Sequence, residues 1–350
     1  MFLNEEQIDR NIGWLLEHAS PPVLYLTHKY ILKADPDTPE MAGLWHQVET
    51  CRPAQDIFSK QNPDGSWFAG GAWAAKPSYS PQEGHEPTTP KYVTTAWILP
   101  LLADMGLDRH DPRIRRACNY MLTFQWPEGF FASARTFSLR DQADKKSHLP
   151  VIPCHFAVYL SAFAQVGMGA DPQLKKSFDL LVRWQQPDGG WLDERHKTGA
   201  IAPYVVWNRS CPWSTYHAAS ALFHSGDLDY REPTRRALNF LVGHLAEKNE
   251  NDIKHLYYHG HITVRELVML TETGLGIDER PVQVLLEWLM TMYHSNEGRF
   301  AYTGKSVSQY SASVDGVSPR VMKYRLYHLI EDDWLTYYLT RIAKNLTNYG

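Results

Sequence analysis

Apolar positions recur along this chain at helical spacing, in segments separated by turn residues. The most continuously apolar segments end near glycines and cover residues 92–106, 154–167, 213–226 and 259–274. Segments that are apolar on one side only alternate with them. Because helices of an outer layer meet water on one side and helices of an inner layer do not, this alternation predicts an inner and an outer set of helices.

The two ends of the chain complete the predicted pattern. We expect a helix over residues 22–33 to begin the inner set and a long helix over 324–345 to end it. The amphipathic helix over 5–18 then becomes the outer partner of the last inner helix. Six inner helices suffice to close a ring, so we expect a single domain over residues 1–350 that is closed by its own termini.

A repeated turn follows several of the outer segments. The sequences QNPDGSW, QWPEGFF and QQPDGGW place a glutamine before a Pro-Asp-Gly or Pro-Glu-Gly turn and an aromatic residue after it. We take Gln61, Gln125 and Gln186 as the anchors, which recur about every sixty residues. A weaker copy closes at Phe300, and a copy without its aromatic end lies near Arg235.

The chemistry of this turn explains its residue order. Pro63 or Pro187 stops the preceding helix, and the Asp-Gly pair that follows suits a tight turn in which glycine takes a positive φ. The turn lets Trp67 or Trp191 fold back over the end of the helix. We expect the glutamine amide to bond backbone groups that the terminated helix leaves unpaired.

The turn sequences carry a family resemblance. QNPDGSW and QQPDGGW resemble the QW repeats of squalene-hopene and oxidosqualene cyclases, and the helix pairs resemble the β-subunits of protein prenyltransferases. The resemblance covers roughly residues 41–345. It implies an all-α fold, an α6/α6 barrel (α/α toroid) with a deep apolar cavity, and isoprenoid ligands that are cyclised or transferred.

One signature of this superfamily is an Asp-x-Asp-Asp acid that protonates an alkene or epoxide. Its nearest match is residues 330–333, where Ile330 replaces the first aspartate. We predict Asp332 and Asp333 as catalytic carboxylates, because adjacent carboxyl groups at low dielectric can raise one pKa. The alternative is a solvated helix face.

The second signature is a zinc site built from Asp-x-Cys and Tyr-His at the starts of consecutive inner helices. Cys154 and His217 match it, whereas Ile152 stands where the family has aspartate. Zinc sites usually take at least three protein ligands, so we predict Cys211 as a further ligand to Zn²⁺ or another divalent metal, with no cofactor as the alternative. His155 is a candidate third ligand, and we predict it as a catalytic acid or base.

The cavity lining is predicted from aromatic and histidine residues near the inner segments. Twelve Trp, nineteen Tyr and thirteen Phe supply apolar faces with polar tips. The predicted substrate-binding residues are Trp97, Tyr159, Trp213, Tyr216, His259, His261, Tyr327 and His328.

Charge and cysteine content limit the binding partners and the cellular compartment that we expect. A net charge of −4 gives no field that would gather nucleic acid or an anionic membrane. The polar start and the lack of an apolar run of about 18 residues predict a cytoplasmic protein without a signal peptide or membrane segment. Four scattered cysteines predict reduced thiols. We expect a monomer or a homodimer.

The resemblance implies a terpene cyclase- or prenyltransferase-like enzyme that acts on an isoprenoid or a similar apolar small molecule. Two alternatives stay open. One is a non-catalytic barrel that binds a lipid or isoprenoid. The other is a carbohydrate-active α/α toroid, which would need paired carboxylates across a cleft. Its candidates are Asp332, Asp333, Glu266 and Asp193.

Overall fold

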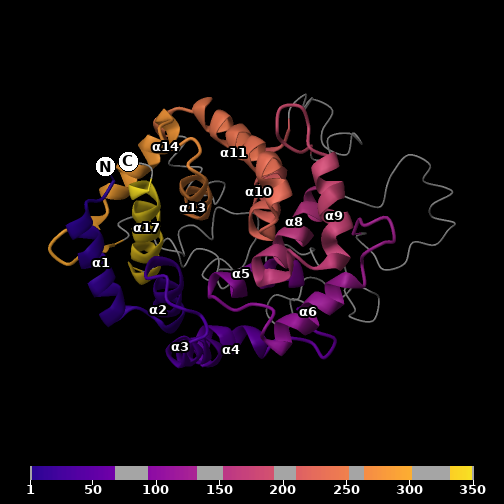
Figure 1. Cartoon of the computed structure of the whole chain (residues 1–350), viewed down its shortest axis with the longest axis horizontal. Coiled ribbons are helices and arrows are strands. Elements are labelled where there is room, and N and C mark those ends of the chain that lie inside the picture. The colour runs from indigo at the N-terminus through magenta and orange to yellow at the C-terminus, as the bar shows by residue number, and fades with distance from the viewer. Residues whose placement is uncertain are drawn as a thin grey trace. The chain divides into compact units, whose positions relative to one another are not determined.

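The chain is mostly helical in the part that its computed structural model describes, residues 2–67, 94–131, 153–192, 210–251, 264–301 and 332–348 (Figure 1). Strands within these ranges are limited to β1 (Tyr293–His294) and β2 (Arg299–Phe300), which pair antiparallel. None of the described helices is both long and apolar enough to cross a membrane. The predicted all-α class is therefore confirmed, and the barrel arrangement stays a prediction.

The helices fall into two compact units. The first unit covers Met1–Gln55 and Val242–Gly350, and the second covers Asp56–Leu241. The first contains α1 (Glu5–His18), α2 (Pro21–Leu26), the π-helix η1 (Thr27–Ile31), α3 (Pro39–Thr50), α13 (Val264–Thr273), α14 (Arg280–Met290) and α17 (Asp332–Thr347).

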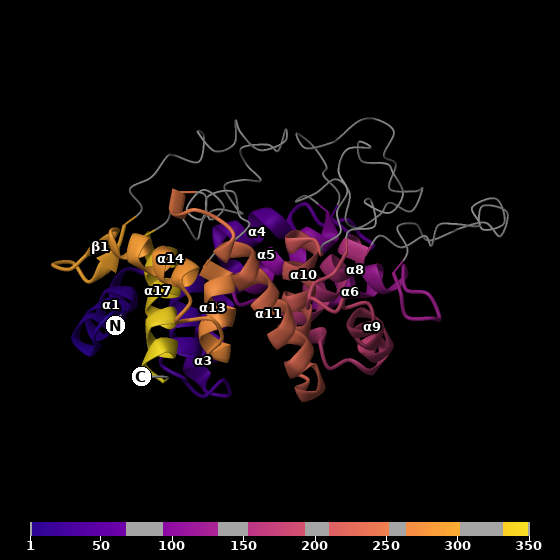
Figure 2. The ribbon, with the colours of Figure 1, turned by 90° about the horizontal axis from the view of Figure 1, so that it is seen from above.

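The second unit contains α5 (Thr95–Asp104), α6 (Pro112–Leu122), α8 (Pro153–Phe163), the π-helix η4 (Ala164–Met168), α9 (Pro172–Arg183), α10 (Pro212–Ser225) and the short 3-10 helix η6 (Leu228–Tyr230). Two helices contain the positions at which the chain passes between the units, α4 (Arg52–Phe58) and α11 (Arg231–Ala246). Figure 2 gives a second view of the same elements.

Helices of two kinds alternate within the second unit, as the apolar pattern predicts. The buried residues of α9, including Leu174, Phe178 and Leu181, recur at helical spacing on one side. In α8, by contrast, every residue from Phe156 to Phe163 is buried. This helix packs against both α5 and α10. It therefore has the surroundings expected of an inner helix.

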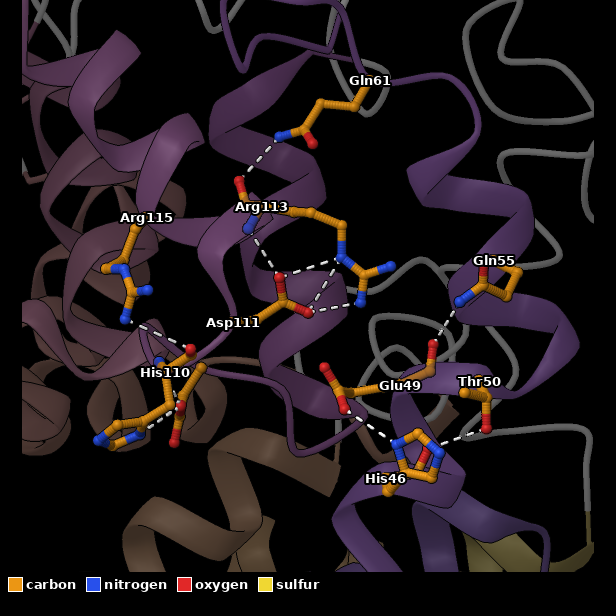
Figure 3. A network of polar contacts seen from close by, with 10 residues as sticks. His46, Glu49, Thr50, Gln55, Gln61, His110, Asp111, Arg113 and Arg115 are labelled. Carbon is orange, nitrogen blue, oxygen red and sulfur yellow. Dashed lines mark hydrogen bonds and ion pairs between the residues drawn. The ribbon is translucent and has the colours of Figure 1, made fainter.

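The repeated turns join each outer helix to the next one. The Gln61 amide donates to the carbonyl of Gly65 (3.0 Å) and to that of Arg113 in the first turn of α6 (2.8 Å), the second bond drawn in Figure 3. The Gln125 amide likewise donates to the carbonyl of Gln173 in the first turn of α9 (2.9 Å). The glutamine thus bonds the following helix rather than the helix that it terminates.

The third turn corrects one predicted anchor. Gln185, not Gln186, donates to the carbonyls of Gly189 and Pro233, both at 2.8 Å. Gln185 precedes Trp191 by the same interval that separates Gln61 from its tryptophan. Gln186 instead donates its amide to the Trp184 carbonyl. The Gln185 side chain thus bonds the first turn of α11, whereas Gln186 contacts α11 through its backbone carbonyl, which accepts from Arg236 (2.9 Å).

The aromatic residue of each turn is buried, as predicted. The indole N–H of Trp67 donates to the Ile57 carbonyl (2.9 Å), and that of Trp191 donates to the Leu181 carbonyl (2.9 Å). A positive φ is required at Gly189, where a Cβ would lie 2.5 Å from the Arg236 carbonyl oxygen. The turn and the following helix therefore lie too close together for a side chain at this position.

The weak copy of the turn, which ends at Phe300, contacts α1 in the same way. A Cβ on Gly298 would lie 2.9 Å from the carbonyl oxygen of Arg10. With its amide nitrogen turned toward the surrounding acceptors, Asn11 donates to the carbonyls of Gln7 and Gly298, both at 3.0 Å. These two acceptors correspond to those of Gln61 and Gln185. Relative to its turn, α1 thus occupies the place that α6 and α11 occupy relative to theirs.

The terminal helices of the first unit pack together. Helix α1 has the bounds expected from the sequence, and the Thr340 hydroxyl of α17 donates to the amide oxygen of its Asn11 (3.0 Å). The C-terminal helix is described from Asp332 to Thr347, so its start at residue 324 lies outside the described residues. The expectation that these two helices close a ring stays a prediction.

Candidate active site

Several aromatic rings meet in the second unit near the starts of α5 and α10. Trp97 lies in the first turn of α5, while Trp213, Tyr216 and His217 lie in the first turns of α10. The Trp97 ring lies 6.0 Å from that of Trp213 and 5.5 Å from that of His217. All four side chains are partly exposed. We call these four residues the ring cluster.

His217 lies at the centre of the ring cluster. Its imidazole is 4.5 Å from the Trp213 ring and 4.9 Å from the Tyr216 ring, measured between centroids. Trp213 and His217 are four residues apart, so they share one face of α10. The imidazole plane stands nearly perpendicular to both indoles, at 81° to Trp97 and 71° to Trp213. Such edge-to-face packing is an arrangement that the quadrupoles of aromatic rings favour.

Two further predicted residues lie on α8. Tyr159 is buried and stacks on Phe131, the aromatic residue of the second turn, with centroids 5.1 Å apart. His155 is partly exposed near the start of the helix. The ring contact makes Tyr159 part of the core of the second unit. The substrate-binding role of Tyr159 and the catalytic role of His155 stay predictions.

The predicted metal ligands are incompletely described. Cys211 is a partly exposed free thiol at the N-cap of α10, and His217 is surrounded by rings. The side chain of Cys154 lies outside what the structure describes. The described residues contain no group of three or more His, Cys, Asp or Glu side chains that could hold a metal ion. The metal site therefore stays a prediction.

The predicted carboxylates at the start of α17 have structural partners in the first unit. Asp333 accepts hydrogen bonds from the backbone N–H (2.9 Å) and the hydroxyl (2.6 Å) of Ser20. It thereby holds the residue that precedes α2. Asp332 forms an ion pair with Arg299. Both contacts explain these residues structurally, and their catalytic role stays a prediction.

Four predicted substrate-binding residues lie outside the described residues: His259, His261, Tyr327 and His328. The same holds for Asp193, a carboxylate candidate for the carbohydrate alternative. Glu266, another of those candidates, is buried on α13 in the first unit.

Sequence reasoning missed a charged cluster in the first unit. Arg341 of α17 donates through Nε to Glu272 of α13 (3.0 Å) and through Nη1 to the Tyr337 hydroxyl (3.0 Å). Its guanidinium also lies 4.1 Å from the ring centroid of Tyr30 in η1. Burial raises the pKa of Tyr337. The only sequence signal was an arginine four residues after a tyrosine in an apolar helix.

Comparisons with known proteins find similarity in structure alone. No protein-family profile matches the chain. No curated protein matches it in sequence. A solved structure of a protein from Actinoplanes aligns over 99% of each chain, with 13% identity and a TM-score of 0.41.

Structures of the type II terpene cyclase MstE from Scytonema are also similar. A ligand-free variant aligns over 97% of each chain, with 14% identity and a TM-score of 0.43. A complex with geranylgeranyl dihydroxybenzoate aligns over 97% of each chain, with 13% identity and a TM-score of 0.41. The activity of this chain has to be argued from its own residues.

Proposed function

We propose that this protein is a terpene cyclase- or prenyltransferase-like enzyme acting on an isoprenoid or a similar apolar small molecule. The ring cluster carries the proposal. Rings that lie 4.5 to 6.0 Å apart and remain partly exposed form an apolar wall with π-faces. Such a wall attracts both a hydrocarbon chain and a carbocation formed along it.

The proposed chemistry is proton-initiated cyclisation. An acid protonates one alkene of the substrate, a neighbouring alkene attacks the resulting cation, and a base removes a proton at the end, so the product is an isomer of the substrate. The ring cluster would stabilise the cation between these steps. Of the predicted acids, His155 is the first to test, because Ser20 and Arg299 already engage Asp333 and Asp332.

Metal assistance remains a separate hypothesis. Zn²⁺ or another divalent cation would require Cys154, His217 and Cys211 to converge. The described residues supply no complete ligand group, and the proposed steps use none. Metal content of the purified protein, compared with that of Cys154→Ala, tests this hypothesis.

We propose the α6/α6 barrel, one domain over residues 1–350, as the scaffold of this activity. The position of α1 supports it, because Gly298 and Asn11 bond this helix as the other turns bond α6 and α11. Helix α1, from the start of the chain, thus completes the last repeat. Small-angle scattering of the purified protein would distinguish a compact ring from an extended array of helices.

Incubation with isoprenoids tests the proposed activity. The probes are geranylgeranyl diphosphate and geranylgeranyl dihydroxybenzoate, the compound bound to the Scytonema enzyme. We expect a product of unchanged mass with fewer alkene signals in its NMR spectrum. A bound probe that raises the melting temperature without turnover would indicate the binding-protein alternative. Neither turnover nor a shift in melting temperature with any probe would refute the proposal.

Replacing single rings tests the role of the cluster. Trp97→Leu and Trp213→Leu each remove a π-face but keep an apolar side chain. A cation–π contact away from water contributes about 2 kcal/mol, so kcat should fall roughly thirtyfold. Trp126→Leu is the matched control, because Trp126 is also partly exposed but stacks on Phe130 in the second turn. Equal losses in all three variants would contradict the assignment.

A further inference from the structure

Two threonine hydroxyls join the buried turns to the helices that carry the ring cluster. The backbone N–H of Trp67 donates to the Thr95 hydroxyl at 2.9 Å. The backbone N–H of Trp191 donates to the Thr215 hydroxyl at 3.0 Å. Both threonines are fully buried. The two bonds are equivalent, so the same hydrogen bond from a turn to a threonine occurs at the start of α5 and at the start of α10.

These threonines are direct neighbours of the ring cluster along the chain. Thr95 precedes Trp97 by two residues, and Thr215 lies midway between Trp213 and His217. The two helices therefore present their rings from the same turn that the threonine holds. Trp97 comes from one side of the cluster, and Trp213 with His217 comes from the other.

Further contacts prevent the third turn and α10 from moving separately. The N–H of Cys211 donates to the Trp191 carbonyl (2.8 Å), and the Ser210 hydroxyl donates to Asp188 (2.8 Å). A Cβ on Gly190 would lie 2.8 Å from the Thr215 hydroxyl oxygen. This glycine therefore leaves room for the threonine in the turn.

The turns themselves are held by the outer helices. Gln61 bonds the first turn of α6, and Gln185 bonds the first turn of α11. Each thereby links an outer helix through a turn and a threonine to one side of the ring cluster. The two links end at the helices whose Trp97 and His217 rings lie 5.5 Å apart between centroids.

We infer that Thr95 and Thr215 are positioning residues of the candidate active site. They do not touch substrate in this assignment. They hold the ring spacing that decides which points along an apolar chain meet a π-face. The catalytic meaning of the inference rests on the proposed function, whereas the positioning itself can be measured without turnover.

The test replaces each hydroxyl with a methyl group of similar size. Thr95→Val and Thr215→Val remove the two positioning bonds. Thr336→Val is the matched control, because the Thr336 hydroxyl accepts the same bond from the Phe300 N–H (2.9 Å) on α17, which carries no ring of the cluster. All three variants should lose comparable stability. Only the first two should alter the cluster.

The His217 ring protons report on the cluster directly, because the neighbouring indoles shift their NMR frequencies. The signal is identified by its loss in His217→Gln. We expect Thr95→Val and Thr215→Val to move it, Thr336→Val to leave it in place, and Thr215→Ser to restore it. An unmoved signal in both positioning variants, or an equal shift in the control, would overturn the inference.

Turnover gives the second measurement. A displaced ring should lower kcat by roughly ten- to a hundredfold and increase products released before the last ring closes. The control should keep the product ratio of the wild type. If the wild type turns over no isoprenoid, the proposed function fails, and the His217 signal still decides whether the two threonines position the rings. An unchanged product ratio in both positioning variants of an active enzyme would also overturn the inference.

Discussion

The two adjacent glutamines of the third turn allow a direct test of the repeat. Gln185→Ala removes two hydrogen bonds, to the carbonyls of Gly189 and Pro233. Gln186→Ala removes one, to the carbonyl of Trp184. The two side chains are buried to a similar degree, so the variants differ chiefly in these bonds.

The expected magnitudes follow from the bonds that are lost. A hydrogen bond contributes about 1 kcal/mol net, and a buried carbonyl left without a donor costs about 1–3 kcal/mol. Gln185→Ala should therefore lower the free energy of unfolding by about 2–4 kcal/mol. Gln186→Ala, with one local bond, should lower it by about 1 kcal/mol or less. Gln61→Ala should match the larger loss, because its amide makes the same two kinds of bond.

Urea unfolding followed by circular dichroism measures these differences. Hydrogen exchange of the peptide over residues 181–192 adds a local measurement within the second compact unit. Gln185→Ala should speed exchange at the Trp191 amide, whose N–H bonds the Thr215 hydroxyl. An equal or larger loss in Gln186→Ala would refute the assignment of the anchor.

Three other predictions concern single side chains. Gly189→Ala should lower the free energy of unfolding by more than about 2 kcal/mol, because the φ of Gly189 is +91° and a Cβ would meet backbone atoms at 2.5 Å. Gly243→Ala should raise the free energy of unfolding by roughly 0.5–1 kcal/mol, because a Cβ there would meet nothing within 4 Å. The midpoints of urea unfolding compare the two variants. Burial raises the pKa of the Cys118 thiol from 9.0 to about 12. The neutral buried thiol makes its full contribution to the free energy of unfolding below pH 9, and this contribution is lost as the pH rises toward 12, by about 1.4 kcal/mol per pH unit. The wild type should therefore lose more stability than Cys118→Ala between pH 8 and 10. Parallel losses in the two proteins would contradict the assignment. Asp333→Ala should cost about 1–3 kcal/mol in thermal or urea unfolding through its lost bonds to Ser20, and Asp333→Asn should keep most of that stability because its amide oxygen still accepts.

Local sequence signals were sufficient for much of the fold. Helix 5–18 could be predicted at its observed bounds because Asn4 and Gln7 form a capping box at its start. The burial of Trp67 and Trp191 followed from Pro-Asp-Gly turns that send the chain back over a helix end. The anchor Gln185 could have been chosen over Gln186 from its spacing to Trp191, which equals the spacing of Gln61 to Trp67, and the structure adds its bond to α11.

For the candidate site, the sequence indicated residue types and the structure decided their neighbours. Aromatic residues in apolar inner segments indicated Trp97, Trp213 and Tyr216, and the structure brings them together with His217. The role predicted for His217 came from a two-residue motif. A motif specifies residue types, whereas the neighbours of an imidazole depend on how α5 and α10 pack.

The sequence by itself determined the helical class, the turn chemistry and the candidate aromatic residues of each helix, because each follows from patterns within one helix or one turn. Tertiary structure decided the pairings across long stretches of chain. Arg341 donates to Glu272, which lies 69 residues away in the sequence. Asn11 of the first helix makes the bond to the turn that a glutamine makes in the other repeats. Such pairings depend on which helices come into contact in space, and no local pattern of apolar and polar residues encodes that choice.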